Sequence, residues 1–298
     1  MTVAHLHWQE RQQLRDPILV CAFKGWNDAG DAASAAVQFL CESFDAQPLA
    51  TIDPEEFYDF TAVRPNVRLV DGRSRAIDWP DNSFHAARVS VADRDLIMLN
   101  GIEPSLRWKT FCDMVLEVAR ESGARMVVTL GALLADVPHS RPVGITGLAS
   151  TEGMVERLGF ERTSYEGPTG IVGVLHAICA DAGLDSVSLW APVPHYVAAT
   201  PNPKAALALV RGFEGIAGIA IDATALETAS EDYDRQVTAA VATDPDVKAF
   251  VERLEEMADE LSEEEGPSEQ SLPSGDVIAR EFQRFLRQRG PGDDEGTS

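Results

Sequence analysis

The chain has 298 residues, of which 45% are hydrophobic and 24% charged, so it is long enough to bury a large core and ordinary in composition for a globular protein. Its charge is less ordinary, because 48 acidic residues against 25 basic ones give a net charge of -23. A surface this acidic repels phosphate backbones and anionic lipids, which argues against nucleic-acid binding and against membrane association.

The sequence predicts a cytoplasmic protein with reduced thiols. The N-terminus has no apolar segment after a basic start, as a secretory signal would, and no stretch approaches the roughly 18 uninterrupted apolar residues of a membrane span. The cysteines are dispersed and form no C-x-x-C pair, which favours buried thiols over a disulfide framework or a zinc site. They are Cys21, Cys41, Cys112 and Cys179.

The chain begins with an alternation of apolar runs and amphipathic segments. Residues 18–23 have the length and β-branching of a buried strand, residues 29–44 predict a helix rich in small side chains, and residues 48–53 predict the next strand. This order is a βαβ unit, whose strands run parallel. Residues 67–91 instead contain short alternating segments with turn signals, which indicate an antiparallel hairpin at the edge of the sheet.

After residue 94 the alternation of strands and helices resumes and continues to about residue 220. A regular succession of this kind predicts a three-layer α/β/α sandwich with a mainly parallel sheet. The expected strands are 95–100, 125–131, 144–149 and 186–191, and the expected helices are 105–121, 170–182 and 203–219.

Beyond Asp222 no strand pattern remains, and the chain reads as a helical hairpin interrupted near Asp244 and Pro245. A charge run and a Gly/Pro/Ser-rich stretch follow, and then a segment with an apolar stripe of Ile278, Phe282 and Phe285. The predicted units are an α/β/α core domain (1–221), a helical subdomain (222–262), an acidic flexible linker (263–275), an amphipathic helix (276–289) and a disordered tail (290–298).

Polar and glycine residues gather in the loops after the predicted strands, where open α/β sheets bind ligands. The loop after residues 18–23 contains Asn27 and Asp28. Asp28 is suited to cap the following helix, and either side chain could contact a ligand. A second carboxylate, Asp31, lies near the same helix terminus, and the loop matches no glycine-rich nucleotide motif, so we do not expect a phosphate site there.

Two further loops carry candidate acid–base groups. Glu103 follows strand 95–100, at a position common for a general base. The loop after strand 125–131 contains Asp136, His139 and Arg141, which either form a carboxylate-oriented histidine beside a cation or close the sheet through salt bridges. The histidine and carboxylate spacing lacks the pattern of a zinc site.

The last two loops contribute the remaining candidates. Glu166 lies on a Gly/Pro turn, Thr169 is expected to cap the next helix, and His195 follows two prolines after strand 186–191, as a structural or a catalytic histidine. No nucleophile motif is present, and no metal or cofactor is expected, so any chemistry would be acid–base or electrostatic. The catalytic candidates are Glu103, Asp136, His139, Glu166 and His195, and the ligand-contact candidates are Asn27, Asp28, Thr169 and Tyr196.

Five ordered motifs in these loops, within about residues 15 to 260, resemble the actinobacterial branch of the proteasome assembly chaperone type 2 family. The resemblance implies an α/β/α core similar to nucleoside phosphorylases and a homo-oligomer, with a trimer as one candidate state. It implies no settled activity for this branch. The motifs are Gly25-Trp-Asn-Asp-Ala-Gly30, Gly101-Ile-Glu-Pro104, Gly131-Ala-Leu-Leu-Ala-Asp-Val-Pro-His139, Tyr165-Glu-Gly-Pro-Thr-Gly170 and Val193-Pro-His-Tyr196.

The chain departs from the resemblance at its end. Assembly-chaperone relatives dock on the proteasome α-ring through a C-terminal hydrophobic–Tyr–any-residue tail, whereas this sequence ends in Glu295-Gly-Thr-Ser298, so that mode of docking is not expected. Two functions stay open. The first is an oligomeric interaction factor with a protein partner. The second is a small-molecule binding protein or enzyme of the phosphorylase/hydrolase-like class, and this hypothesis predicts that Glu103, Asp136, His139 and Glu166 share one pocket.

Overall fold

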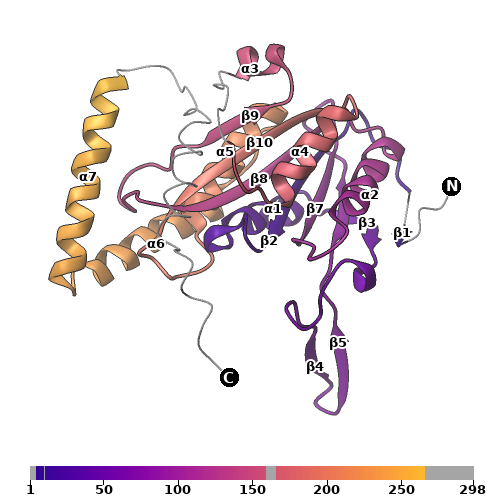
Figure 1. Ribbon diagram of the computed structural model, residues 1–298, viewed down its shortest axis with the longest axis horizontal. Helices are drawn as coiled ribbons and strands as arrows, with labels where there is room; N and C mark the ends of the chain where they lie inside the picture. Colours follow the sequence, from indigo (N-terminus) through magenta and orange to yellow (C-terminus); the bar gives the residue numbers. More distant parts are fainter. Residues whose placement is uncertain (1–4, 10, 159–165, 266–298) are drawn as a thin grey trace.

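The computed structural model describes residues 5–9, 11–158 and 166–265 (Figure 1). Its centre is an eight-stranded sheet in the order β1-β3-β6-β7-β2-β8-β10-β9. The four strands β7, β2, β8 and β10 run parallel, whereas β1, β3, β6 and β9 join their neighbours in antiparallel pairs. The sheet is therefore mixed, with a parallel centre. The strands are β1 (Leu6–Trp8), β2 (Ile18–Lys24), β3 (Gln47–Ile52), β6 (Ser83–Ala87), β7 (Leu96–Ile102), β8 (Met126–Ala135), β9 (Thr146–Ala149) and β10 (Asp185–Pro194).

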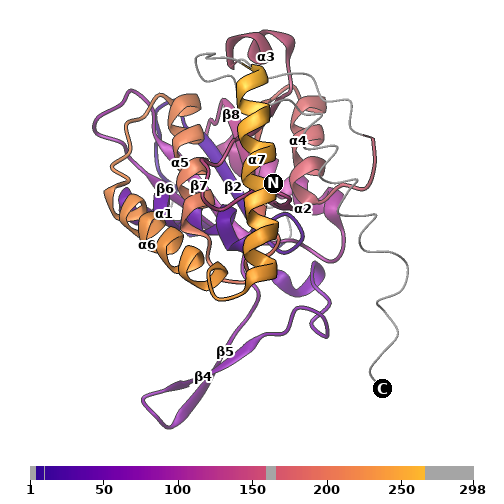
Figure 2. The same cartoon turned by 90° about the vertical axis from the view of Figure 1, so that its left-hand side faces the viewer.

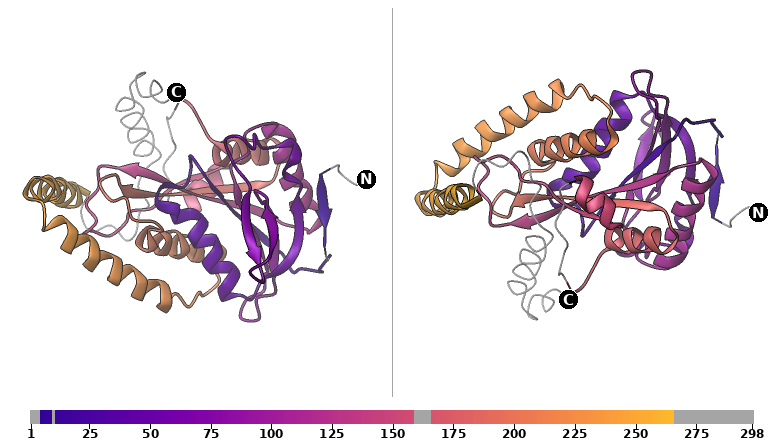
Figure 3. Two further views of the ribbon diagram at one scale, coloured as in Figure 1. Left: turned by 90° about the horizontal axis from the view of Figure 1, so that it is seen from below. Right: turned by 90° about the horizontal axis from the view of Figure 1, so that it is seen from above.

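Helices cover both faces of this sheet, as the views from below and above show (Figure 3). The layering follows from the alternation of β2, in which Ile18, Val20 and Ala22 face one apolar core while Leu19 and Phe23 face the other. Helices α1 and α5 pack on the first core, and α2 and α4 on the second. This confirms the α/β/α layers. The helices are α1 (Ala32–Ser43), α2 (Trp108–Glu121), α4 (Ile171–Asp181) and α5 (Pro203–Ala217), with a short α3 (Glu152–Leu158) and two 3-10 turns, η1 (Ala29–Asp31) and η2 (Pro54–Glu56).

The predicted βαβ unit needs one correction. Strands β2 and β3 do run in the same direction, but β7 and β6 lie between them in the sheet. Strand β1, which the sequence pattern did not reveal, pairs with β3 at the edge. Strand order depends on which apolar faces pack together, and the periodicity of a single segment does not carry that information.

The expected hairpin forms, but it is not at the sheet edge. Strands β4 (Asn66–Val70) and β5 (Ser74–Asp78) make a separate two-stranded sheet that projects from the body (Figures 1 and 2). The last part of the same segment, β6, is instead inserted between β3 and β7. The difference is one of burial, because Phe84 on β6 is fully buried whereas most residues of β4 and β5 are exposed.

Two long helices follow the core, as the sequence predicts. They are α6 (Thr224–Val241) and α7 (Pro245–Glu265), and the break between them lies at the expected Asp244 and Pro245. Helix α6 packs on α5, and α7 stands at the far end of the molecule from β1 (Figure 1). Helix α7 continues through Glu265, past the predicted start of the linker at residue 263. The rest of that linker, the predicted helix 276–289 and the tail 290–298 lie outside the described residues.

All four cysteines are free thiols, in agreement with the sequence prediction. Burial raises the pKa of each, to about 12 for Cys112 and Cys179 and to about 11 for the half-buried Cys41. Among the described residues, no helix combines the length and apolarity needed to cross a bilayer.

Candidate functional site

The parallel strands β7, β2, β8 and β10 end at one edge of the sheet, and the predicted site residues follow those ends, except Glu166 and Thr169, which precede α4. Their contacts fall into two groups. The first joins the loops after β2 and β7 to the start of α4. The second joins the loops after β8 and β10 to helices α5, α6 and α7.

The first group centres on Glu103. Its Oε1 accepts a hydrogen bond from the Asn27 side-chain amide and another from the backbone N–H of Ile171, both at 2.8 Å. Ile171 is the first residue of α4, so the carboxylate lies at a helix N-terminus, where unpaired N–H groups favour negative charge. The predicted cap was wrong. Gly170 is the N-cap of α4, with no side-chain cap bond, and Thr169 is exposed on the preceding loop.

Asn27 and Gly170 lie in close contact. A Cβ atom on Gly170 would come within 2.3 Å of Asn27 Nδ2 and 2.4 Å of its Oδ1, so this position requires glycine because of the approach. Asn27 is 1% exposed, and its Oδ1 has no hydrogen-bond partner among the described residues. The first group is thus a tightly packed junction of three loops.

The N-cap residue of α1 is Asp31, which makes no side-chain cap bond, so the expected capping contact comes from three residues earlier, through the side chain of Asp28. Its Oδ1 accepts the backbone N–H groups of Ala33 at 2.7 Å and Ser34 at 3.2 Å. The second carboxylate oxygen, Oδ2, is buried and has no partner within the described part of the chain. Burial raises the pKa of Asp28 above 3.8, although the hydrogen bonds from Ser34 and Ala33 act in the opposite direction.

Asp136 and His195 come together at the ends of β8 and β10. The parallel register places Ala135 opposite Pro194, so the next residue of each strand faces the other. His195 Nδ1 lies 3.0 Å from Asp136 Oδ1, and their side chains are 38% and 22% exposed. This is a carboxylate-oriented histidine with part of its imidazole open to solvent, the arrangement that general acid–base chemistry uses.

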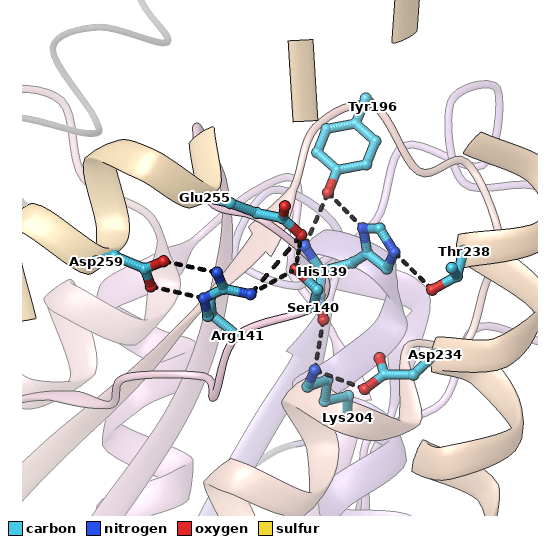
Figure 4. A network of polar contacts seen from close by, with 9 residues as sticks. All are labelled: His139, Ser140, Arg141, Tyr196, Lys204, Asp234, Thr238, Glu255 and Asp259. Atoms are coloured by element: carbon cyan, nitrogen blue, oxygen red, sulfur yellow. Dashed lines mark hydrogen bonds and ion pairs between the residues drawn. The ribbon is translucent and has the colours of Figure 1, made fainter. Parts of the chain in front are cut away.

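His139 lies buried between the loop of Tyr196 and helix α6 (Figure 4). Tyr196 Oη accepts the backbone N–H of His139 and lies 2.8 Å from His139 Nδ1, while His139 Nε2 lies 3.1 Å from Thr238 Oγ1. A tyrosine hydroxyl that donates to Nδ1 leaves the proton of a neutral imidazole on Nε2, facing Thr238. Burial lowers the pKa of His139, partly opposed by Asp234 and Glu255, and so favours the neutral ring.

The loop after β8 is also tied to helices α5, α6 and α7 by charged contacts (Figure 4). Arg141 makes two parallel bonds of 2.7 Å to Asp259, and Ser140 bonds Glu255, both on α7. Lys204 on α5 donates to the His139 carbonyl and, at 2.7 Å, to Asp234 on α6. Of the two alternatives left open for Arg141, the salt-bridged loop is the one that the structure shows.

The second group contains residues that sequence reasoning missed. They are Lys204, Asp234, Thr238, Glu255 and Asp259, which lie on helices with no motif around them. Glu255 and Asp259 belong to an acidic run and are four residues apart, so they share one face of α7. Two carboxylates on one helix face, together with an arginine in a strand-end loop, were the sequence signal from which this ion pair could have been inferred.

The predicted shared pocket of Glu103, Asp136, His139 and Glu166 does not form, because of these four only His139 lines a cavity of the described residues. Glu103 contacts Asn27 and α4, whereas His139 contacts Tyr196 and α6, and Glu166 is exposed on the loop before α4. Among the described residues, no group of three or more His, Cys, Asp or Glu side chains could hold a metal ion.

Two cavities adjoin the second group. A small one of about 70 Å³ is lined by His139 and Lys204 among others. A larger one of about 430 Å³ lies between the loop after β10, helix α6 and the start of α7. Its lining residues are Tyr196, Val197, Ala198, Ala199, Tyr233, Gln236, Val237, Ala240, Val241, Asp244 and Val247.

Comparison with known proteins identifies close structural relatives. The model of the PAC2 family matches residues 22–241. A PAC2 family protein from Streptomyces avermitilis is 44% identical, with a TM-score of 0.74 over 79% of this chain and 100% of the other. A proteasome-assembly chaperone homologue from Mycobacterium tuberculosis is 43% identical, with a TM-score of 0.73 over 78% of this chain and 99% of the other.

More distant structures share the fold. An archaeal proteasome activator from Pyrococcus furiosus is 18% identical, with a TM-score of 0.64 over 79% of this chain and 97% of the other. A sequence search of curated proteins found no significant match.

Proposed function

The chain belongs to the PAC2 family, and we propose that it acts as a protein-interaction factor that binds proteasome subunits and assists their assembly. The observation that carries the proposal is the 43% identity, over 78% of this chain, to a protein described as a proteasome-assembly chaperone homologue. The family resemblance in the strand-end loops, drawn first from the five motifs, agrees with membership of the PAC2 family.

The contacts at the strand ends are compatible with this role. Glu103 and Asp28 accept backbone N–H groups of helices α4 and α1, and Arg141 holds α7. Each of these side chains therefore contributes to positioning a helix. A protein that acts by presenting surfaces to a partner needs fixed helices and needs no convergent catalytic group.

The proposal includes several finer expectations from the sequence. The protein works as a homo-oligomer in the cytoplasm, and its core is of the nucleoside-phosphorylase-like kind. Residues 1–221 form the core domain and residues 222–262 a helical subdomain, which presents α6 and α7 to other molecules.

The test is a measurement of assembly rate. Purified proteasome α and β subunits of an actinobacterium are mixed with and without an equimolar amount of this chain, and formation of the core particle is followed on native gels. An unrelated acidic protein of similar mass serves as the control for charge. We expect the chain, but not the control, to accelerate assembly or raise its yield. An unchanged rate and yield would contradict the proposal.

A second candidate is a small-molecule binding protein or enzyme of the phosphorylase/hydrolase-like class. The cavity of about 430 Å³ favours it, because ligand pockets have volumes of roughly 300–1,000 Å³. Tyr196 lines that cavity and follows His195, which Asp136 orients. Of the predicted candidates, these three are the residues that this function would use.

A thermal-shift screen with nucleosides, nucleotides and metal ions tests this second candidate. A ligand that binds the folded state raises the melting temperature, by an amount that grows with its concentration. The variant Ala240→Trp, which fills the cavity, should abolish any shift. A wild-type protein that no compound stabilises, or a shift that Ala240→Trp leaves intact, would count against this site.

A further inference from the structure

The projecting hairpin of β4 and β5 has one apolar face. In its antiparallel register Val67 pairs with Ile77 and Leu69 with Arg75, so these four side chains point to the same side. Val67, Leu69 and Ile77 are 61%, 65% and 56% exposed, respectively. Three neighbouring aliphatic side chains of one sheet are thus left in contact with solvent.

This exposure is unusual for a monomer. An isolated two-stranded hairpin is marginally stable in water, and exposed contiguous apolar patches mark interaction sites. The hairpin stands away from the body in both perpendicular views, so its own chain does not cover this face within the described residues (Figures 1 and 2). At its base Trp79, itself 49% exposed, packs against Phe60 with ring centroids 4.9 Å apart.

The charge of the hairpin is opposite to that of the chain. Residues 64–79 contain four arginines and two aspartates, a net charge of +2 in a protein whose net charge is -23. Arg68 pairs with Asp78 on the other face, whereas Arg73 and Arg75 are exposed near the turn. The surface that fits this hairpin is therefore apolar at its centre and acidic around it.

Helix α7 offers such a surface. Met257 and Leu261 are four residues apart, hence on one face of the helix, and are 50% and 63% exposed. Residues 245–265 contain nine acidic and two basic residues. Arg141 neutralises part of this charge through Asp259, but Glu256 and Glu260 beside the apolar pair are exposed.

We propose that the hairpin of one copy of this chain docks on α7 of a second copy, with Val67, Leu69 and Ile77 covering Met257 and Leu261. The match of apolar and charge character on the two surfaces supports this occupant. A contact within one copy is ruled out, because α7 stands at the left of the molecule in Figure 1 while the hairpin projects below its other side. The inference rests on the proposed homo-oligomer and is independent of the proteasome partner.

A contact between two different surfaces can repeat from copy to copy. Each copy carries one hairpin and one α7, so an open assembly keeps one unused hairpin and one unused α7 until a ring closes, and the smallest such ring is a two-fold dimer with two reciprocal contacts. A dimer in which one element meets itself, hairpin on hairpin or α7 on α7, has no such property. This difference gives the inference a specific test.

The test uses two variants that disable one surface each, Leu69→Glu on the hairpin and Leu261→Glu on α7, in the full-length chain. Sedimentation equilibrium measures their masses. We expect the wild type to have a multiple of the chain mass of 32.3 kDa and each variant alone to have 32.3 kDa. An equimolar mixture of the two variants retains one intact hairpin and one intact α7, so it should form a 1:1 dimer and grow no further. Val91→Glu is the matched control, because Val91 is 75% exposed and lies on neither surface, so it should retain the wild-type mass.

Each other outcome overturns the inference. If both variants keep the wild-type mass, other surfaces make the oligomer, and the proposed homo-oligomer survives without this interface. If Leu261→Glu alone still associates while Leu69→Glu does not, the hairpins contact each other. If the wild type itself has 32.3 kDa, the homo-oligomer fails too, and the assembly-rate experiment alone decides the interaction with proteasome subunits. Far-UV circular dichroism identical to that of the wild type establishes that each variant is folded.

Discussion

The carboxylate of Glu103, at the end of β7, accepts the backbone N–H of Ile171, the first residue of α4, at 2.8 Å. The same oxygen accepts the side-chain amide of Asn27 from the loop after β2. A candidate general base is thereby engaged in a contact that fixes a helix to the sheet. One of the five catalytic candidates of the sequence thus has a structural task.

Removing this carboxylate should destabilise the fold. Glu103→Ala leaves the N–H of Ile171 and the amide of Asn27 without their acceptor, so the free energy of unfolding should fall by about 1–3 kcal/mol. Urea denaturation followed by circular dichroism measures it. Glu103→Gln, which keeps an acceptor oxygen, should lose less. Glu166→Ala, at an exposed position, serves as the control and should stay within about 0.5 kcal/mol of wild type. Equal stability of Glu103→Ala and Glu166→Ala would refute a structural role for Glu103.

The contact between Gly170 and Asn27 makes a prediction about coupling. Gly170→Ala places a methyl group within 2.3 Å of the Asn27 side chain, so the core must shift, at a cost of about 1–3 kcal/mol. Shortening Asn27 to alanine removes the clash, so the double variant should be more stable than the sum of the single effects predicts. A double-mutant cycle in urea measures the coupling. Gly153→Ala is the control, because an added Cβ there would meet no atom from another part of the fold within 4 Å. Additive effects of the two single variants would show that the clash is absent.

The pair of Arg141 and Asp259 should stabilise α7 locally. Arg141 makes two parallel bonds to Asp259, a geometry that lysine cannot reproduce. Arg141→Lys should therefore destabilise α7 nearly as much as Arg141→Ala does. Both side chains are partly exposed, so the expected loss is about 1 kcal/mol or less. Hydrogen exchange resolves the site: amides of 245–265 should exchange faster in both variants while those of β2 stay protected. Arg211→Ala is the control, because Arg211 pairs with Glu214 and Glu227 away from α7. Unchanged exchange in α7 would contradict the role of this pair.

The buried carboxyl of Asp28 predicts a pH dependence of stability. Its raised pKa means that the folded state holds this proton at a pH where the unfolded state, with a pKa near 3.8, has released it. The contribution of Asp28 to stability therefore declines as the pH rises from 3.8 through the raised value. Asp28→Asn keeps an acceptor for the N–H of Ala33 and cannot ionise. The unfolding free energy of this variant, minus that of wild type, should grow over that interval and be constant at higher pH. A difference that does not vary with pH would contradict the assignment.

The sequence predicts the core elements well because they carry their own periodicity. Helix α2 has Phe111, Val115 and Val118 at spacings of three and four, and the structure buries all three. The edge strand β1 was not predicted, because three residues are too few to show a periodicity. Strands β4 and β5 were wrongly placed at the edge of the main sheet, because an alternating pattern does not reveal whether a face is covered.

The site could be predicted only in part, for a similar reason. Loops after parallel strands must meet, so Asp136 beside His195, and Glu103 beside Asn27, follow from topology. The pairing of Lys204 with Asp234 depends on how α6 packs on α5, and neither helix contains a sequence pattern that predicts it. Thr169 was mistaken for a cap because a good capping residue stands one position before the glycine that takes this role.

The most direct test of the account is a binding measurement with defined components. The purified full-length chain is mixed with recombinant proteasome α subunits and measured by native mass spectrometry. The spectrum should show a complex that contains an integral number of copies of this chain and of the α subunit. The account predicts that this complex disappears from the spectrum once β subunits are added and the core particle forms, since an assembly factor acts on incomplete particles. Spectra that contain only the separate species at every ratio would contradict the proposed function.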